Sequence, residues 1–137
     1  MPGSKLALDT NAAIGVLNAA GQSGMATERD AAWALPVQVV GELRFGALKS
    51  SRTKENLAKI DALVGTCDVL NTTSATATTY ADVRQQLRRL GRPIPENDLW
   101  IAALCLEHHL PLATNDRHFA AVIGLETRPI QTPPVAE

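Results

Sequence analysis

Four acidic residues, spread over most of the chain, occupy positions where a carboxylate could do chemistry. Asp9 comes directly after a short apolar run, and Asp116 lies just beyond another one. Asp98 and Glu42 fall on or beside the apolar stripe of an expected helix. Charged side chains rarely face a protein interior unless something pairs with them. These four acids are therefore our candidate site.

The helical spacing turns Asp98 inward. It shares a helix face with the apolar residues Ile101, Ala102 and Cys105, in a first turn where the helix dipole favours an anion. Glu42 lies at the margin of the inward stripe of its own helix. We therefore expect two of the acids to reach the site from helices and two from strand ends.

Each acid also has a simple structural interpretation: Asp9 and Asp116 could cap helices, Asp98 could be a dipole residue and Glu42 could be solvated. Two carboxylates about 4 Å apart, however, repel by about 4 kcal/mol at an effective dielectric of 20. A cluster of four requires protonation or a divalent cation at neutral pH. Oxygen ligands favour Mg²⁺, Mn²⁺ or Ca²⁺, and Mg²⁺ in particular suits phosphoryl chemistry.

Short apolar runs that alternate with helical segments must position these acids. We expect strands at about residues 5–8, 32–35, 67–70, 111–113 and 125–128. We expect helices at about 11–18, 36–49, 53–64, 73–90 and 96–108, and a helical turn at 117–122. This alternation predicts an α/β domain of three layers, with a mainly parallel central sheet and helices on both faces. Sites in such sheets form beyond the carboxyl ends of the strands.

Length and composition predict one globular domain over residues 1–130, with a mobile tail at 131–137 that contains two adjacent prolines. The net charge of -1 excludes a uniformly basic surface, although not a local basic patch. Cys67 and Cys105 form no CxxC pair, so neither a zinc site nor a disulfide scaffold is predicted. No signal-peptide pattern or bilayer-length apolar run is apparent, and we expect a cytoplasmic protein.

Four sequence blocks contain the acids, in order: LDTN at 8–11, GELRFGA at 41–47, PIPENDLWIAA at 93–103 and LATNDRHF at 112–119. Together they resemble the PIN-domain ribonucleases, in particular the VapC-type toxins of toxin–antitoxin pairs. The resemblance implies a PIN-like fold and an Mg²⁺-dependent endoribonuclease, with Mn²⁺ as a substitute ion. It also implies that such an enzyme is the toxin of a type II pair.

The same resemblance implies a role for individual residues. The catalytic quartet would be Asp9, Glu42, Asp98 and Asp116, of which Asp9, Asp98 and Asp116 would bind the metal. Neighbouring polar residues would orient the acids: Thr10, Asn11, Thr114 and Asn115. The implied partners are an RNA substrate, a small VapB-type antitoxin that covers the acidic groove, and a second copy of the chain in a homodimer.

Most of the lysines and arginines fall in two stretches, 44–59 and 84–92. Arg44, Arg88 and Arg92 are our candidates for contacts with RNA phosphates. Two solvated helix faces are an equally good interpretation of the same charges.

Other functions remain open at this point. The chain could be a non-toxin PIN nuclease in RNA processing, or a metal-stabilised RNA-binding or protein-binding module without catalysis. A phosphatase with Asp9 as nucleophile would need a second acid at position 11, where the chain has Asn11. A nuclease that uses histidines could draw on His118, whereas His108 and His109 lie at the end of a helix and suit its dipole.

Overall fold

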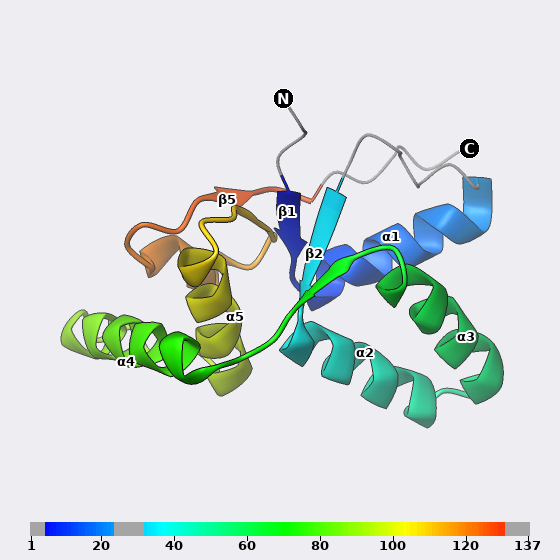
Figure 1. The fold of residues 1–137 in the computed structure, drawn as a ribbon, viewed down its shortest axis with the longest axis horizontal. Helices are drawn as coiled ribbons and strands as arrows, with labels where there is room; N and C mark the ends of the chain where they lie inside the picture. Colours follow the sequence, from blue (N-terminus) through cyan, green and yellow to red (C-terminus); the bar gives the residue numbers. More distant parts are fainter. Residues whose placement is uncertain (1–4, 24–31, 131–137) are drawn as a thin grey trace.

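The computed structural model describes residues 5–23 and 32–130, with alternating strands and helices (Figure 1). The first half contains β1 (Lys5–Leu8), α1 (Thr10–Ser23), β2 (Ala32–Pro36), α2 (Val37–Lys49), α3 (Thr53–Val64) and β3 (Asp68–Leu70). The second half contains α4 (Ser74–Arg89), α5 (Glu96–Glu107), β4 (Leu112–Ala113), the 3₁₀ helix η1 (Arg117–Ala121) and β5 (Thr127–Arg128).

The strands form one sheet in the order β3-β2-β1-β4-β5, and every neighbouring pair is parallel. Parallel neighbours need a crossover between them, and helices supply the first three crossovers. In Figure 1, α4 and α5 lie together on one side of the strands and α1, α2 and α3 on the other. The predicted α/β class with a mainly parallel sheet is therefore confirmed.

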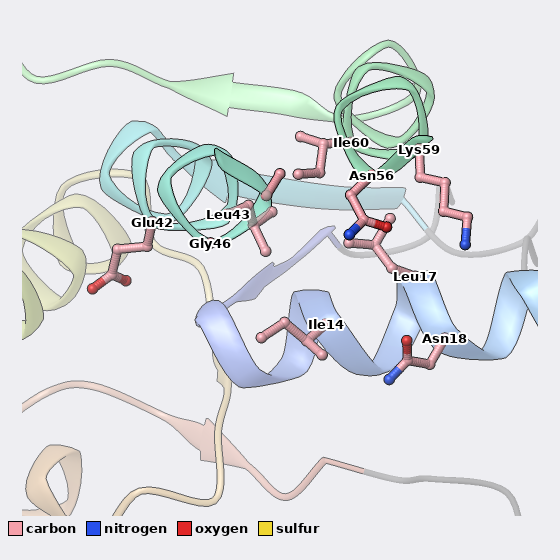
Figure 2. A pocket seen from close by; sticks show the side chains of 10 residues that line it. Ile14, Leu17, Asn18, Glu42, Leu43, Gly46, Asn56, Lys59 and Ile60 are labelled. Atoms are coloured by element: carbon pink, nitrogen blue, oxygen red, sulfur yellow. The ribbon is translucent and has the colours of Figure 1, made fainter. Parts of the chain in front are cut away.

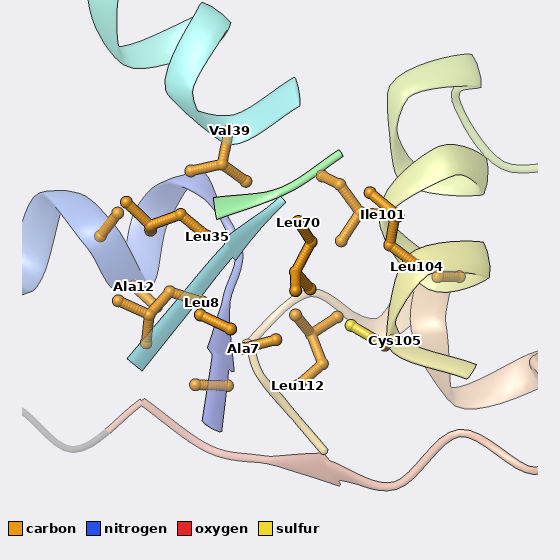
Figure 3. Close-up of a cluster of buried hydrophobic side chains, with 14 of the residues drawn as sticks. Ala7, Leu8, Ala12, Leu35, Val39, Leu70, Ile101, Leu104, Cys105 and Leu112 are labelled. Atoms are coloured by element: carbon orange, nitrogen blue, oxygen red, sulfur yellow. The ribbon is translucent and has the colours of Figure 1, made fainter. Parts of the chain in front are cut away.

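The core lies between the strands and the helices that cover them (Figure 3). Ala7, Leu35 and Leu112 are fully buried, because a covered parallel strand has no solvent face. Helix α5 is buried nearly all round, since Leu99 and every residue from 101 to 105 are less than a tenth exposed. The helix that carries Asp98 is thus held rigidly inside the domain.

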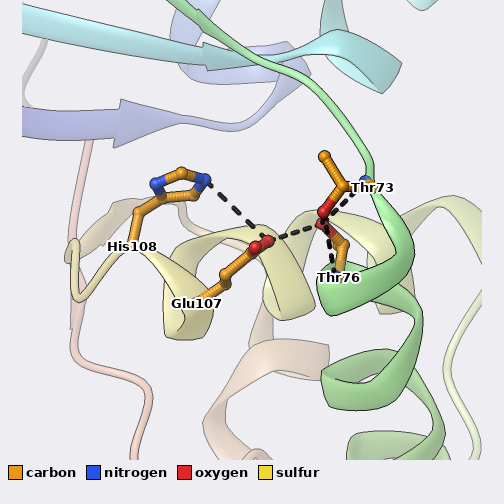
Figure 4. Close-up of polar contacts among 4 residues, drawn as sticks. All are labelled: Thr73, Thr76, Glu107 and His108. Carbon is orange, nitrogen blue, oxygen red and sulfur yellow. Dashed lines mark hydrogen bonds and ion pairs between the residues drawn. The ribbon is translucent and has the colours of Figure 1, made fainter.

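The ends of α4 and α5 are tied to each other (Figure 4). Thr73 and Thr76 form a capping box at the start of α4, and the buried Thr76 hydroxyl donates to Oε1 of Glu107 at 2.5 Å. Glu107 stands at the carboxyl end of α5, where the helix dipole disfavours an acid. The positive end of α4 and the Thr76 hydroxyl offset that cost. Further along, the rings of Tyr80 and Trp100 stack 4.0 Å apart.

Both of these helices end in a left-handed residue, Gly91 after α4 and His109 after α5. The N–H of Arg92 donates to the carbonyl of Leu87, and the N–H of Leu110 does the same to Cys105, each at 2.9 Å. These are the long hydrogen bonds of Schellman motifs. Gly91 directly follows the predicted helix end at about residue 90, and glycine is the residue that most readily adopts this left-handed conformation.

The boundaries of several elements differ from the predictions. The sequence favours a loop, in part helical, over residues 19–30; helix α1 continues to Ser23, and residues 24–30 lie outside the described residues. Pro36 ends β2, with an extended ψ of 139°, rather than standing in the first turn of α2. Strands β3, β4 and β5 are one or two residues shorter than expected.

The expected tail at 131–137 also lies outside the described residues, and the single-domain division stays a prediction. Within the described ranges, no helix combines the length and the apolarity needed to cross a bilayer.

Candidate active site

The carboxyl ends of β1 and β4 bring Asp9 and Thr114 to the same edge of the sheet. Leu8 pairs with Ala113 in the parallel register, and the Asp9 N–H donates to the Ala113 carbonyl at 3.2 Å. The Asp9 carboxylate is buried and accepts the N–H of Ala12 at 2.8 Å, which caps α1. The capping interpretation is correct for Asp9, and its charge also lies at the strand end where a site is expected.

The loop after β4 folds back on itself and presents Asp116. The hydroxyl of Thr114 accepts the N–H of Asp116 at 2.9 Å, and the Asp116 carboxylate accepts the N–H of His118 at 2.9 Å. Asp116 thereby caps η1. Because these bonds close a tight turn, the side chain of His118 returns toward the carboxylate that begins the turn.

Asp98, Asp116 and His118 converge on one point. Nδ1 of His118 lies 3.0 Å from Oδ1 of Asp116 and 3.5 Å from Oδ2 of Asp98. One ligand atom from each residue lies within 4.8 Å of the other two. Asp98 comes from the first turn of α5 and Asp116 from the end of β4, so the fold joins two of the predicted acids here.

The pKa of Asp98 is raised above its ordinary value. Burial is the main cause, because the inward face of α5 removes water from the carboxylate. The negative charges of Asp116 and Glu42 raise the pKa further, whereas the hydrogen bond from His118 lowers it. Asp98 is therefore a half-buried carboxylate close to other negative charges, and a nearby cation would stabilise its charged form.

Glu42 reaches the same region from α2. Its carboxylate accepts a hydrogen bond from the hydroxyl of Thr10, the first residue of α1. The Glu42 side chain is exposed, and it acts on Asp98 through its charge. Neither Glu42 nor Asp9 belongs to the group of described ligand atoms that lie within 4.8 Å of one another.

The remaining predicted residues have different surroundings. Asn11 is exposed in the first turn of α1, and the Asn115 side chain accepts the N–H of Ile130 at 2.9 Å, which ties down the segment after β5. Arg44 pairs with Asp61 at 2.8 Å, so its guanidinium already has an acidic partner. The other two arginines predicted to contact phosphate are exposed: Arg88 and Arg92.

A groove of about 310 Å³ lies between α1, α2 and α3, and Glu42 stands at one end of it (Figure 2). Its walls are mostly aliphatic, with Ile14, Leu17 and Ile60 among them, and Lys59 stands at the opposite end from Glu42. The acidic region therefore continues into an apolar channel on the surface.

The donors at this site suit a divalent cation. Carboxylates bind Mg²⁺, Mn²⁺ and Ca²⁺, and imidazole nitrogen is a ligand for transition ions. The sequence offered His118 only as an acid or base of an alternative, histidine-based nuclease, because its place beside the acids depends on the direction of its ring. The signal that could have found it is its place two residues after a capping Asp, where the turn returns the side chain.

Comparisons with known proteins identify the family of the chain. The PIN domain family model matches residues 6–125. The chain is 40% identical to a tRNA(fMet)-specific endonuclease VapC of Shigella flexneri over 63% of this chain and 66% of that enzyme. It is 34% identical to ribonuclease VapC5 of Mycobacterium tuberculosis over 66% of this chain and 69% of that protein. The matches thus span about two thirds of these curated relatives.

Solved structures share the fold. VapBC2 of Rickettsia felis, crystallised with a promoter DNA fragment, has a chain that superposes with a TM-score of 0.81 at 22% identity, over 93% of this chain and 99% of that one. A chain of VapBC-5 from Mycobacterium tuberculosis gives 0.71 at 29% identity, over 93% and 100%. With the family model covering most of its length, the chain belongs to the PIN-domain family and, within it, to the VapC-type ribonuclease toxins.

Proposed function

We propose that the chain hydrolyses RNA phosphodiester bonds with a bound Mg²⁺ ion, for which Mn²⁺ can substitute, as the toxin of a type II pair. The observation that carries this proposal is the convergence of Asp98 and Asp116 at the carboxyl edge of the sheet, with the pKa of Asp98 raised. Two acids placed together in this way favour a cation between them. From the proposed RNA substrate we infer a cytoplasmic location.

The proposed ligands are Asp9, Asp98 and Asp116, with Glu42 as the fourth acid of the site. When bound by these residues, a divalent ion would supply an activated water and would neutralise charge on the phosphate oxygens. The chain holds the acids in place: Thr10 fixes Glu42, and Thr114 fixes the turn that presents Asp116. An acid that does not contact the ion remains free to accept the proton that the attacking water loses.

Substrate and partner would use the surfaces beside the acids. Arg88 and Arg92 are exposed and suit RNA phosphates, whereas Arg44 suits them less because Asp61 already pairs with it. A VapB-type antitoxin could fill the apolar groove that begins at Glu42 and place an arginine on the acids. A homodimer or an antitoxin would also cover the exposed large apolar side chains: Ile14, Phe45, Leu48, Leu90 and Ile123.

Cleavage of a mixed cellular RNA pool by the purified protein tests the activity. We expect cleavage with Mg²⁺, none with EDTA, and none for Asp98→Asn, which keeps the shape of the side chain but removes its charge. The matched control is Asp82→Asn, an exposed acid of α4, which should cleave like the wild type. End mapping of the products would identify the RNA and the position that is cut.

Two results would contradict the proposal. Cleavage that persists in EDTA would exclude the metal-dependent reaction. Wild-type protein that binds RNA without cutting it would favour the non-catalytic binding module. For the toxin role, co-expression with the small antitoxin should relieve growth arrest caused by the chain, and arrest that continues would count against that pairing.

A further inference from the structure

We infer that His118 is a ligand of the bound ion, through Nδ1, and that it gives the site a preference for Mn²⁺ over Mg²⁺. This inference rests on the proposed metal-dependent function and concerns a residue outside the acidic quartet. Its basis is the position of the imidazole, which points into the space between Asp98 and Asp116.

The separations between the donor atoms fit a shared ion. In octahedral coordination with metal–ligand bonds of about 2.1 Å, adjacent ligand atoms lie about 3.0 Å apart. Nδ1 of His118 lies 3.0 Å from Oδ1 of Asp116 and 3.5 Å from Oδ2 of Asp98. The two separations that involve His118 are therefore near the spacing of adjacent ligands of one ion, and the ligand atoms of the two acids lie within 4.8 Å of each other.

The local backbone fixes the imidazole in that place. The N–H of His118 donates to the Asp116 carboxylate at 2.9 Å, so the two residues are joined through the main chain as well as through the ring. The neighbouring Phe119 is almost fully buried, which anchors η1 to the core. His118 is therefore held by the fold, although its side chain is nearly half exposed.

The chemical identity of the donor atom determines which ion is bound more tightly. Mg²⁺ is bound mainly through oxygen and keeps much of its water, whereas Mn²⁺ also suits oxygen ligands but, as a first-row transition ion, accepts an imidazole nitrogen as well. The proposed carboxylate ligands together with one imidazole should thus bind Mn²⁺ more tightly than the carboxylates alone. The alternative is that a protonated His118 stands in for the cation and must leave before an ion can bind.

Titration with Mn²⁺, followed by electron paramagnetic resonance at one fixed pH, separates these two roles. If His118 is a ligand, His118→Ala should weaken Mn²⁺ binding by at least about tenfold, given that even groups behind the ligands contribute 10–100-fold. Mg²⁺ affinity, measured by competition, should change much less. Pulsed spectra of the Mn²⁺-loaded wild type should show coupling to a nitrogen nucleus, and His118→Ala should lose it.

His108→Ala is the matched control, because His108 is similarly exposed and also lies near an acid, at 3.9 Å from Glu107. Its Mn²⁺ affinity should equal that of the wild type. Unchanged or tighter binding by His118→Ala, or the absence of nitrogen coupling, would overturn the inference. If Asp98→Asn still abolishes binding in that case, the proposed function stands without His118; wild-type protein that binds no Mn²⁺ would contradict both.

Discussion

Asp98→Asn should stabilise the metal-free protein while it abolishes RNA cleavage. The carboxylates of Asp98 and Asp116 each place an oxygen within 4.8 Å of the other. At that separation and an effective dielectric of 20, their repulsion is about 3.5 kcal/mol. His118 offsets part of it, and the dipole of α5 contributes about 0.3–1 kcal/mol in favour of the acid. We expect a net gain of about 1 kcal/mol from the substitution.

Thermal unfolding in EDTA measures this gain, which corresponds to an increase in Tm of about 3–4 °C for a chain of this size. Added Mg²⁺ should then raise the Tm of the wild type, by linkage to binding, and leave that of Asp98→Asn nearly unchanged. As Mg²⁺ is added, the Tm of the wild type should therefore approach or exceed that of Asp98→Asn.

Asp82→Asn on the exposed face of α4 provides the comparison, and its free energy of unfolding should differ from that of the wild type by no more than about 0.5 kcal/mol. A clear loss of stability for Asp98→Asn in EDTA would refute the reasoning. That outcome would mean that Asp98 serves mainly as a first-turn dipole residue, which is the simple structural interpretation of its place in the sequence.

Two further predictions concern the scaffold. Thr76→Val should lower the free energy of unfolding in urea by about 2–3 kcal/mol, because it leaves the Glu107 carboxylate without its buried donor, whereas the exposed Thr78→Val should change it by less than about 0.5 kcal/mol. Burial, followed by the charge of Asp9, raises the pKa of Cys105 to about 12, so at pH 8 iodoacetamide should modify Cys67 in the folded protein and Cys105 only after unfolding. The folded pKa of Cys105 exceeds the ordinary value of 9.0, so its contribution to stability should be complete below pH 9 and decline as the pH rises toward 12. Equal labelling rates for the two thiols would contradict this burial.

Most of the fold was predictable because its signals are local. The strands are short apolar runs bounded by polar or turn residues, and the Gly91 stop of α4 follows from the left-handed conformation that glycine adopts freely. The carboxyl end of α1 was not predictable in the same way. Residues 19–23 contain glycine and polar side chains that also suit a loop, and no apolar period marks where the helix ends.

For the acids of the candidate site too, some properties could be predicted from local sequence and others could not. Asp98 faces inward as its helical spacing requires, and burial has the expected effect on its pKa. Glu42 stood at the margin of its helix stripe by sequence, and the structure shows it exposed and bonded to Thr10, a residue 32 positions away. That bond depends on how α1 packs against α2, which no local pattern describes.

By itself, the sequence determined the succession of strands and helices along the chain, the strand ends that carry Asp9 and Asp116, and the family to which the four motifs belong. Those properties follow from periodicity, apolar runs and short-range spacing. The tertiary structure alone decided which donors converge. The parallel pairing of β1 with β4 and the burial of α5 bring together residues that are distant in the chain, and a tight turn points His118 at two of the acids. Convergence of this kind depends on packing and loop direction, which are set only when the whole core forms.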